Sequence, residues 1–331
     1  MVMKHYIQSF PDHISDAVEI AEGVDLGFDI STIRNIVISG QGGSGIGGVI
    51  AKNILQSEIN LPIYINQDYS IPAFVDQNTL FIASSYSGQT EETLQALKYA
   101  IKKESKIFCL CSGGEMLDVV KGQQLNHILI PAGGMPRAML CYSMIQILFI
   151  LSKFHKELDF CGQLRRNLKV CQSYLLKEQL SIIETAQIIC DKIDRQMPFI
   201  YTFPEFEGLA LRFKQQLNEN SKRHAVYNII PEMNHNEIVA WEKHSMCVFP
   251  IFIDGNSSKR NKDRLEINID QISKKVEDYM KLTPNTSDYL QQYFYYIHLV
   301  DWVSLLVAEK DSVDPGEIKS IDYLKKELKN L

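Results

Sequence analysis

A run of glycines between a buried strand and an apolar helix constrains the fold of this chain more than any other feature. Residues 37–54 read VISGQGGSGIGGVIAKNI, in which Gly40, Gly42 and Gly45 have the spacing G-x-G-x-x-G. The backbone N–H groups of such a turn and the N-terminus of the helix that follows form a place for an anion. The segment therefore predicts a strand-turn-helix unit whose turn binds an anionic group.

Strands, loops and helices alternate through all 331 residues. We expect strands over residues 33–39, 62–65, 79–84, 106–110, 127–130, 198–203, 224–229 and 246–253. We expect helices over residues 46–55, 91–103, 115–120, 158–194, 207–217, 289–309 and 318–328, and a long one beginning near Pro136. This order predicts parallel sheets with helices on both faces. We expect two α/β domains, residues 1–153 and residues 154–331.

The glycine spacing alone does not decide which phosphate compound binds. A dinucleotide site needs an acidic residue about 20 residues further on. Asp68 comes late for that role and follows a strand that contains a proline. A P-loop is excluded because no Gly-Lys-Ser/Thr follows. Ser44, at the head of the helix, can cap that helix or donate to a phosphate. A tight turn without a ligand is the remaining alternative.

A second turn, SSYSGQTEETLQALK over residues 84–98, carries the same chemistry. Ser85, Ser87 and Thr90 place three hydroxyls within six residues, between a buried strand and a helix. Helix capping by Ser87 or Thr90 is the alternative explanation, but a cap needs one hydroxyl. Three hydroxyls suit a monophosphate with three acceptor oxygens. In that case Glu91 and Glu92 must point away from the phosphate.

Composition and charge exclude several classes of protein. The formal net charge is -6, so an anionic ligand must be held by local donors, and we expect no nucleic-acid partner. Seven scattered cysteines show no metal-binding spacing, which predicts free thiols, no metal site and a reducing compartment. The most apolar segment, residues 141–151, is too short to span a membrane. We expect a cytoplasmic protein without a signal peptide.

Together, GQGGSGIGG over residues 40–48 and SSYSGQTEET over residues 84–93 resemble the sugar isomerase (SIS) domains of the bifunctional phosphoglucose/phosphomannose isomerases. The resemblance implies two flavodoxin-like, doubly wound parallel-sheet SIS domains with a sugar phosphate between them. It implies an aldose–ketose isomerase that needs no cofactor, and a homodimer. The residues that would hold the phosphate are Gly43, Ser44, Ser85, Ser87 and Thr90.

Such an isomerase moves a proton between C1 and C2 through an enediol, which requires a carboxylate base and a group that opens the sugar ring. Glu219, in LNENSKRH just beyond a helix, matches the family's base, although a surface acid is the alternative. Its neighbours Lys222 and Arg223 are expected to face solvent. His235, in PEMNHNEIVAW, matches the family's ring-opening histidine, in its own or a neighbouring subunit's site. A loop histidine bonded to its own turn is the alternative, and Glu237 is expected to orient His235 or to bind structurally.

Two basic residues complete the expected site. Arg137, in GGMPRAMLCY, is expected in the first turn of a long helix, where the helix dipole disfavours a cation. The resemblance assigns it to the enediolate, and a surface salt bridge is the alternative. Near the end of the chain, VDPGEIKSIDYLKK matches the family pattern that places a functional lysine at Lys325. Its neighbour Lys326 is the other candidate.

The sequence departs from the family at four positions, which are Gln41, Gln89, Met139 and Cys141. None of them removes a catalytic group, but they leave the preference between glucose and mannose substrates open. Two other functions share the serine-rich turn. One is an amino-sugar phosphate isomerase, and the other is a sugar-phosphate sensor without enzymatic activity.

Overall fold

The computed structural model describes residues 2–328 and 330, and divides into two compact units. One unit is formed by residues 8–177. The other is formed by residues 2–7, 178–328 and 330. The division falls within the long helix α7 (Phe160–Ile193). The domain boundary at residues 153 and 154 stays a prediction.

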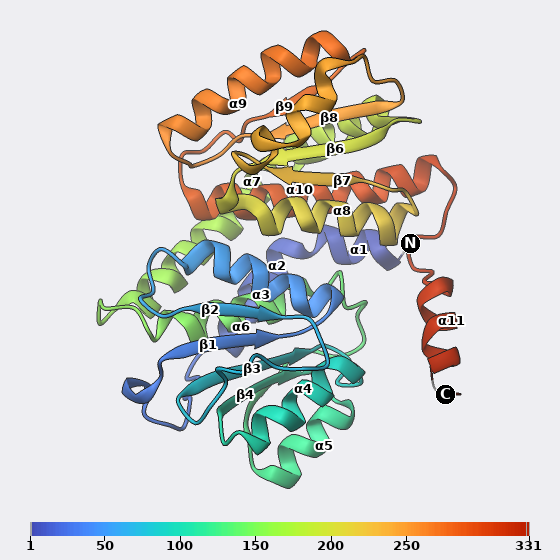
Figure 1. The fold of residues 1–331 in the computed structure, drawn as a ribbon. Coiled ribbons are helices and arrows are strands. Elements are labelled where there is room, and N and C mark those ends of the chain that lie inside the picture. Colours follow the sequence, from blue (N-terminus) through green and yellow to red (C-terminus); the bar gives the residue numbers. More distant parts are fainter. Residues whose placement is uncertain (1, 329, 331) are drawn as a thin grey trace. The chain divides into compact units, whose positions relative to one another are not determined.

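The unit of residues 8–177 is built on a five-stranded parallel sheet with the order β2-β1-β3-β4-β5 (Figure 1). The central strand β3 is buried at every position, as expected for a parallel sheet covered on both faces. Its strands are β1 (Asn35–Ser39), β2 (Ile63–Asn66), β3 (Thr79–Ser85), β4 (Lys106–Cys111) and β5 (Asn126–Leu129).

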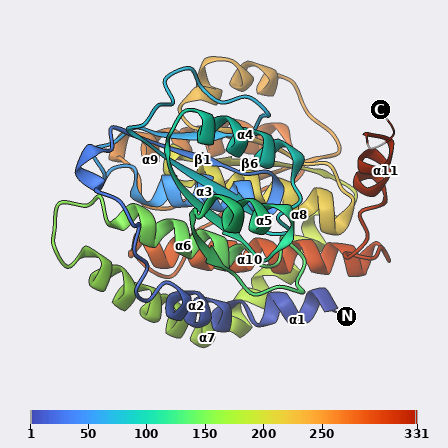
Figure 2. The same ribbon diagram turned by 90° about the horizontal axis from the view of Figure 1, so that it is seen from below.

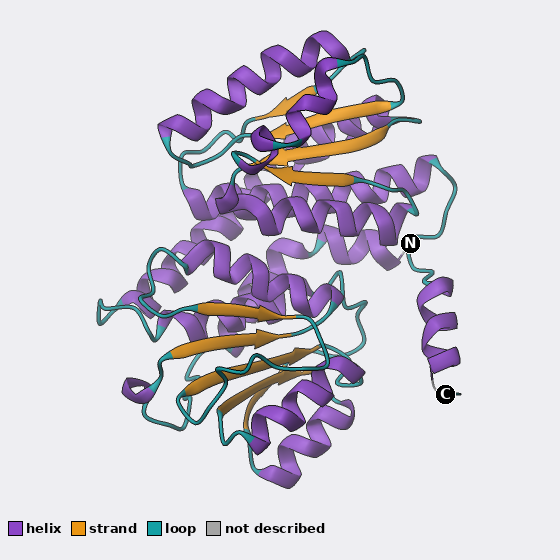
Figure 3. Cartoon of the chain, in the orientation of Figure 1, coloured by secondary structure: helices purple, strands orange, loops and turns teal. Residues whose placement is uncertain are grey.

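Helices cover both faces of this sheet (Figure 3). On one face, Phe81 of β3 shares a buried cluster with Leu97 of α4 and Met116 of α5. On the other face α3 packs closely, because Gly48 leaves room for Ile38 of β1. The helix α6 is buried along its whole length. The helices are α2 (Phe10–Ile20), α3 (Gly42–Leu55), α4 (Glu91–Lys102), α5 (Gly114–Gln123) and α6 (Leu140–Ser152), with α1 (Val2–Gln8) at the unit boundary and the short turn η1 (Ile30–Thr32).

The second unit repeats this plan. Its described residues form a four-stranded parallel sheet with the order β7-β6-β8-β9. That order matches β2-β1-β3-β4, so the loop after β8 is the counterpart of the loop after β3. The strands are β6 (Met197–Thr202), β7 (Val226–Ile229), β8 (Val248–Ile253) and β9 (Met280–Leu282).

The helix α10 (Tyr289–Lys310) forms the core of this unit together with α8 (Glu207–Ser221). The last helix, α11 (Lys319–Leu328), has no buried residue among those that are described. Figures 1 and 2 both show α11 standing apart from α8 and α10 of its own unit. The remaining elements are α9 (Lys259–Ile272), η2 (Pro204–Phe206), η3 (Glu232–His235), η4 (Glu237–Glu242) and η5 (Ser273–Lys275).

The eight expected strands are all present, and the doubly wound α/β fold is confirmed. Three helix boundaries near the predicted site residues were wrong. The helix α3 begins at Gly42 and not at residue 46, so Ser44 lies inside it. The helix α6 begins at Leu140, so Arg137 lies in a turn before it and not in its first turn. The helix α8 continues to Ser221, so Glu219 lies inside its last turn and not beyond it. Among the helices of the described residues, none combines the length and the apolar character that a membrane span requires.

Candidate active site

The two predicted phosphate-binding turns meet within the unit of residues 8–177. Ser44 lies in the first turn of α3, and its Oγ accepts a hydrogen bond of 2.9 Å from the backbone N–H of Tyr86. The chain around Gly40 also lies close to this second turn. A Cβ atom at Gly40 would come within 2.8 Å of the carbonyl oxygen of Ser84. The serine hydroxyl of one turn is therefore held against the backbone of the other.

The hydroxyls of the second turn are arranged toward one another. Ser85 Oγ and Thr90 Oγ1 lie 2.9 Å apart, and Ser85 is fully buried. Thr90 occupies the N-cap position of α4 but makes no side-chain cap hydrogen bond. Helix capping therefore does not explain the presence of a hydroxyl at position 90. The Oγ of the exposed Ser87 accepts a hydrogen bond of 3.2 Å from the N–H of Gln89, which shapes the turn locally.

A third segment, residues 131–137, is attached to both turns. The Tyr86 hydroxyl donates to the carbonyl of Pro131 and accepts from the N–H of Gly134, each at 2.9 Å. Gly43 packs against the backbone of this segment, because a Cβ there would lie 2.9 Å from the nitrogen of Arg137. Arg137 is 5% exposed, so a surface salt bridge does not describe it. Its backbone lies beside Gly43, at the head of α3.

The carboxylates at the start of α4 lie near Tyr69. Glu91 is exposed and Glu92 is half-buried. Desolvation, with the charges of Glu92 and Glu91, raises the pKa of the Tyr69 hydroxyl. The two carboxylates thus interact with a phenol outside the pair of turns. Their orientation relative to a bound phosphate stays a prediction.

In the second unit, Glu219 is half-buried and the residues beside it are tied to α10. The Asn220 amide donates to Ser304 Oγ at 3.0 Å, and the Ser221 hydroxyl donates to the Ser304 carbonyl at 2.6 Å. Two turns earlier on α8, Arg212 pairs with the buried Asp301 at 2.6 Å. This buried polar row fixes the rotation of α8 and with it the direction of Glu219.

His235, one of the two predicted ring-opening residues, and its neighbour Glu237 differ in their surroundings. His235 ends η3 and is exposed, while its neighbour Asn234 donates to Asn268 of α9 at 2.7 Å. Glu237 accepts from the Tyr201 hydroxyl at 2.5 Å and from the Asn228 amide at 2.6 Å, so it binds structurally. Burial, followed by the charge of Glu237, raises the pKa of Tyr201.

Lys325 and Lys326 are both exposed on α11. The structure therefore does not choose between them. Arg223 was expected to face solvent, and this was wrong. It is largely buried against Asp311, which it contacts through two hydrogen bonds of 2.5 and 2.6 Å.

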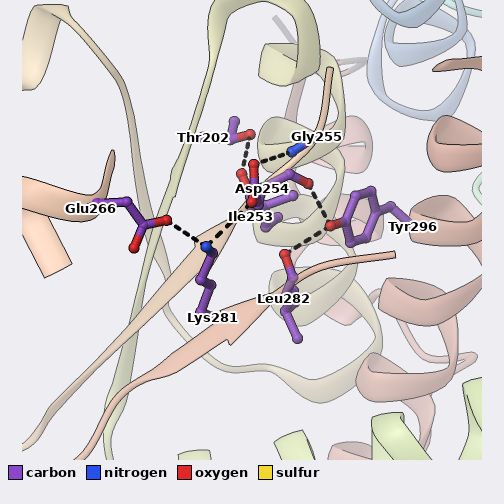
Figure 4. Close-up of polar contacts among 8 residues, drawn as sticks. All are labelled: Thr202, Ile253, Asp254, Gly255, Glu266, Lys281, Leu282 and Tyr296. Carbon is purple, nitrogen blue, oxygen red and sulfur yellow. Dashed lines mark hydrogen bonds and ion pairs between the residues drawn. The ribbon is translucent and has the colours of Figure 1, made fainter. Parts of the chain in front are cut away.

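The loop after β8, the counterpart of the serine-rich turn, is closed on itself (Figure 4). Asp254 accepts from the N–H of Gly255 at 2.8 Å and pairs with Lys281 at 3.3 Å. Ser257 donates to the carboxylate of Glu205, and Ser258 caps α9. These hydroxyls are used inside the unit. The loop carries the carboxylate of Asp254 and contacts that of Glu205 in η2, so its chemistry is unsuited to a phosphate. The duplicated fold thus offers different chemistry in its two matching loops.

Over residues 2–328 and 330, the structure contains no cluster of three or more His, Cys, Asp or Glu that could hold a metal ion. The cysteines in this part of the chain are free. The most informative residue that sequence reasoning missed is Tyr86, because its backbone and hydroxyl join the three segments. Its position between two serines was the available signal.

Two α/β units with parallel sheets, one of which carries a glycine-rich and a serine-rich turn, define a protein of the SIS-domain class. Residues 183–328 match the bacterial phospho-glucose isomerase C-terminal SIS domain. The fold is similar to the C-terminal domain of glucosamine-fructose-6-phosphate aminotransferase from Francisella tularensis, with a TM-score of 0.77, 16% identity, and 96% and 98% of the two chains covered. It is also similar to a glucosamine-6-phosphate deaminase from Thermotoga maritima, with a TM-score of 0.71, 14% identity, and 95% and 96% covered.

Sequence comparison identifies the family within this class. The chain is 35% identical over 330 residues to a bifunctional phosphoglucose/phosphomannose isomerase of Caldicellulosiruptor bescii, covering 97% of each. It is 32% identical to the enzyme of that name from Aquifex aeolicus, covering 93% of this chain and 94% of the relative. The chain belongs to the bifunctional phosphoglucose/phosphomannose isomerase family.

Proposed function

We propose that the protein catalyses the reversible isomerisation of glucose 6-phosphate and fructose 6-phosphate, and of mannose 6-phosphate and fructose 6-phosphate. The observation that carries this proposal is the meeting of the two turns at Ser44 and Tyr86, beside the hydroxyl pair of Ser85 and Thr90. The named activity of the relatives supports it.

In the proposed reaction, Gly43, Ser44, Ser85, Ser87 and Thr90 hold the phosphate. His235 and Lys325 open the sugar ring and leave the C1 carbonyl free. Glu219 then removes the proton from C2 and returns it to C1, so that the enediol collapses to the ketose. Arg137 stabilises the negative charge that develops on the enediolate oxygen. Mannose 6-phosphate forms the same enediol, with the C2 proton on the opposite face.

A parallel assay of both aldose phosphates tests this proposal. Purified protein is mixed with fructose 6-phosphate, without added metal or nucleotide, and glucose 6-phosphate and mannose 6-phosphate are measured separately. We expect both products to form. If neither product forms while fructose 6-phosphate still binds, the protein is a sugar-phosphate sensor and the proposal is wrong.

One relative favours a second substrate class. The chain is 29% identical over 214 residues to a D-glucosamine-6-phosphate 4-epimerase of Sulfolobus acidocaldarius, covering 63% of this chain and 64% of the relative. Glucosamine 6-phosphate is therefore the second candidate substrate. Nuclear magnetic resonance of the sugar after incubation distinguishes epimerisation at C4 from isomerisation at C1 and C2.

We further propose a cytoplasmic homodimer, on the strength of the family resemblance and the free cysteines. The exposed position of His235 allows it to serve the site of a neighbouring subunit. The domain boundary at residues 153 and 154 belongs to the same proposal. Light scattering of the purified protein tests the dimer.

A further inference from the structure

Lys222 ends α8 in a conformation that favours glycine. Its backbone is left-handed, with φ 53° and ψ 31°. At the end of a helix this position is usually taken by glycine, because a side chain there strains the backbone. A lysine that keeps this strained conformation needs a compensating interaction, and its ammonium group provides one.

The ammonium group of Lys222 binds three backbone carbonyls. Its Nζ donates to the carbonyl oxygen of Glu219 at 2.9 Å, of Asn220 at 3.3 Å and of Asp314 at 2.5 Å. An ammonium has three donors, so all three are accounted for. Two of these carbonyls belong to the last turn of α8, where a positive charge also complements the helix dipole. One is the carbonyl of the proposed base itself.

Arg223, the next residue, also attaches the end of α8 to the segment that follows α10. Arg223 contacts Asp311 through two hydrogen bonds, and the Asn218 amide donates to the Arg223 carbonyl at 2.7 Å. Asp311 and Asp314 lie between α10 and α11. The end of α8 is thus attached at two points to the segment that leads to Lys325.

We infer that Lys222 is a positioning residue that fixes the last turn of α8, and therefore Glu219, against the segment leading to α11. On the buried side Asn220 and Ser221 bind Ser304, and on the exposed side Lys222 binds the carbonyls. This inference rests on the proposed function, because the role of Lys222 depends on Glu219 being the base. Lys222 binds the backbone carbonyl of the proposed base and does not contact the sugar.

The test is the variant Lys222→Gly, which separates positioning from stability. Glycine relieves the left-handed backbone, so the melting temperature is expected to equal or exceed that of wild type. Loss of the ammonium group lets the turn shift, and small displacements of a catalytic group reduce rates by up to about 100-fold. In the fructose 6-phosphate assay we expect kcat to fall about 10- to 100-fold while KM stays near the wild-type value. The variant Lys222→Arg offers replacement donors and should recover most of the lost kcat.

Lys262→Met is the matched control, because Lys262 is an exposed lysine of the same unit and its loss should leave kcat unchanged. Glu219→Gln is measured alongside. In the Glu219→Gln background a further Lys222→Gly change should lower kcat little, because a glutamine cannot act as the base wherever it lies. Wild-type kcat in Lys222→Gly, with Glu219→Gln inactive, overturns the positioning role and leaves the proposed function intact. Full activity in Glu219→Gln overturns the base assignment instead.

Discussion

Ser44 Oγ accepts the backbone N–H of Tyr86 at 2.9 Å, across a sequence separation of 42 residues. This hydrogen bond joins the head of α3 to the turn that precedes α4. Parallel strands place such turns at the same edge of the sheet, and here β1 and β3 are direct neighbours. A single anion can therefore meet the donors of both turns, as oxygens of a phosphate require.

Replacement of Ser44 with alanine tests the two functions of its hydroxyl, which are to accept the N–H of Tyr86 and to bind the phosphate. The N–H of Tyr86 would lose its acceptor in a buried position, since Ser44 is 6% exposed. We expect the free energy of unfolding to fall by about 1–3 kcal/mol, and KM for fructose 6-phosphate to rise. Urea unfolding and steady-state kinetics measure the two effects. Ser57→Ala, at an exposed serine after α3, should change neither.

Thr90→Val distinguishes phosphate binding from helix capping. Because the Thr90 side chain does not cap α4, its loss should raise KM. The stability that is lost should come from the buried Ser85 hydroxyl, which loses its partner, and not from the helix end. The matched control is Ser258→Ala, which removes a real cap at the corresponding helix α9. That change should cost about 0.5–2 kcal/mol of stability and leave KM unchanged. Equal effects of the two variants on KM would contradict the assignment of the phosphate to the loop after β3.

Glu219→Gln removes the proposed base and keeps the shape of the side chain. We expect kcat to fall by a factor of about 100 to 10,000, while the dissociation constant for fructose 6-phosphate stays nearly the same. A steady-state isomerase assay measures kcat, and isothermal titration calorimetry measures the dissociation constant. Glu242→Gln, at an exposed glutamate of the same unit, is the control and should remain fully active.

The sequence predicted the sheets better than the polar contacts. Buried strands followed by glycine or serine turns are local signals, and the strands from β1 to β8 lie within a few residues of their expected positions. The helix α9 was missed because half of the residues in KRNKDRLEINIDQI are charged. Only Leu265, Asn268, Ile269 and Ile272 are buried, and they form one narrow face. The strand β9 has three residues, too few for an alternating pattern.

Contacts between distant residues explain the remaining errors. Arg223 looks like a surface residue in SKRH, and only the folded chain brings Asp311 beside it. Arg137 follows a proline that suits a first helical turn, but the turn formed by residues 136–138 ends before α6 begins. Among the site residues, the sequence pointed to the hydroxyl turns. The two serines that flank Tyr86 marked its turn, but only the folded chain shows that Tyr86 joins the three segments.

His298 supports a prediction about the effect of pH on stability. It is buried in α10, where its Nε2 accepts from the indole N–H of Trp302 at 3.2 Å, and burial lowers its pKa to about 3. The unfolded chain, with a pKa of about 6.5, binds this proton more readily than the folded protein does. Stability from this residue is therefore complete above pH 6.5 and is lost as pH falls toward 3. Between pH 7 and pH 5 the loss should be about 2 kcal/mol.

The variant His298→Gln keeps a hydrogen-bond acceptor for Trp302 but cannot take up the proton. Urea unfolding at pH 5 and pH 7 should therefore show a smaller acid-induced loss in the variant than in wild type, by about 2 kcal/mol. The control is His244→Gln, at an exposed histidine of the same unit. The same acid-induced loss in wild type and His298→Gln would show that the acid sensitivity arises elsewhere, because the one-proton difference between the folded and unfolded states would then be missing.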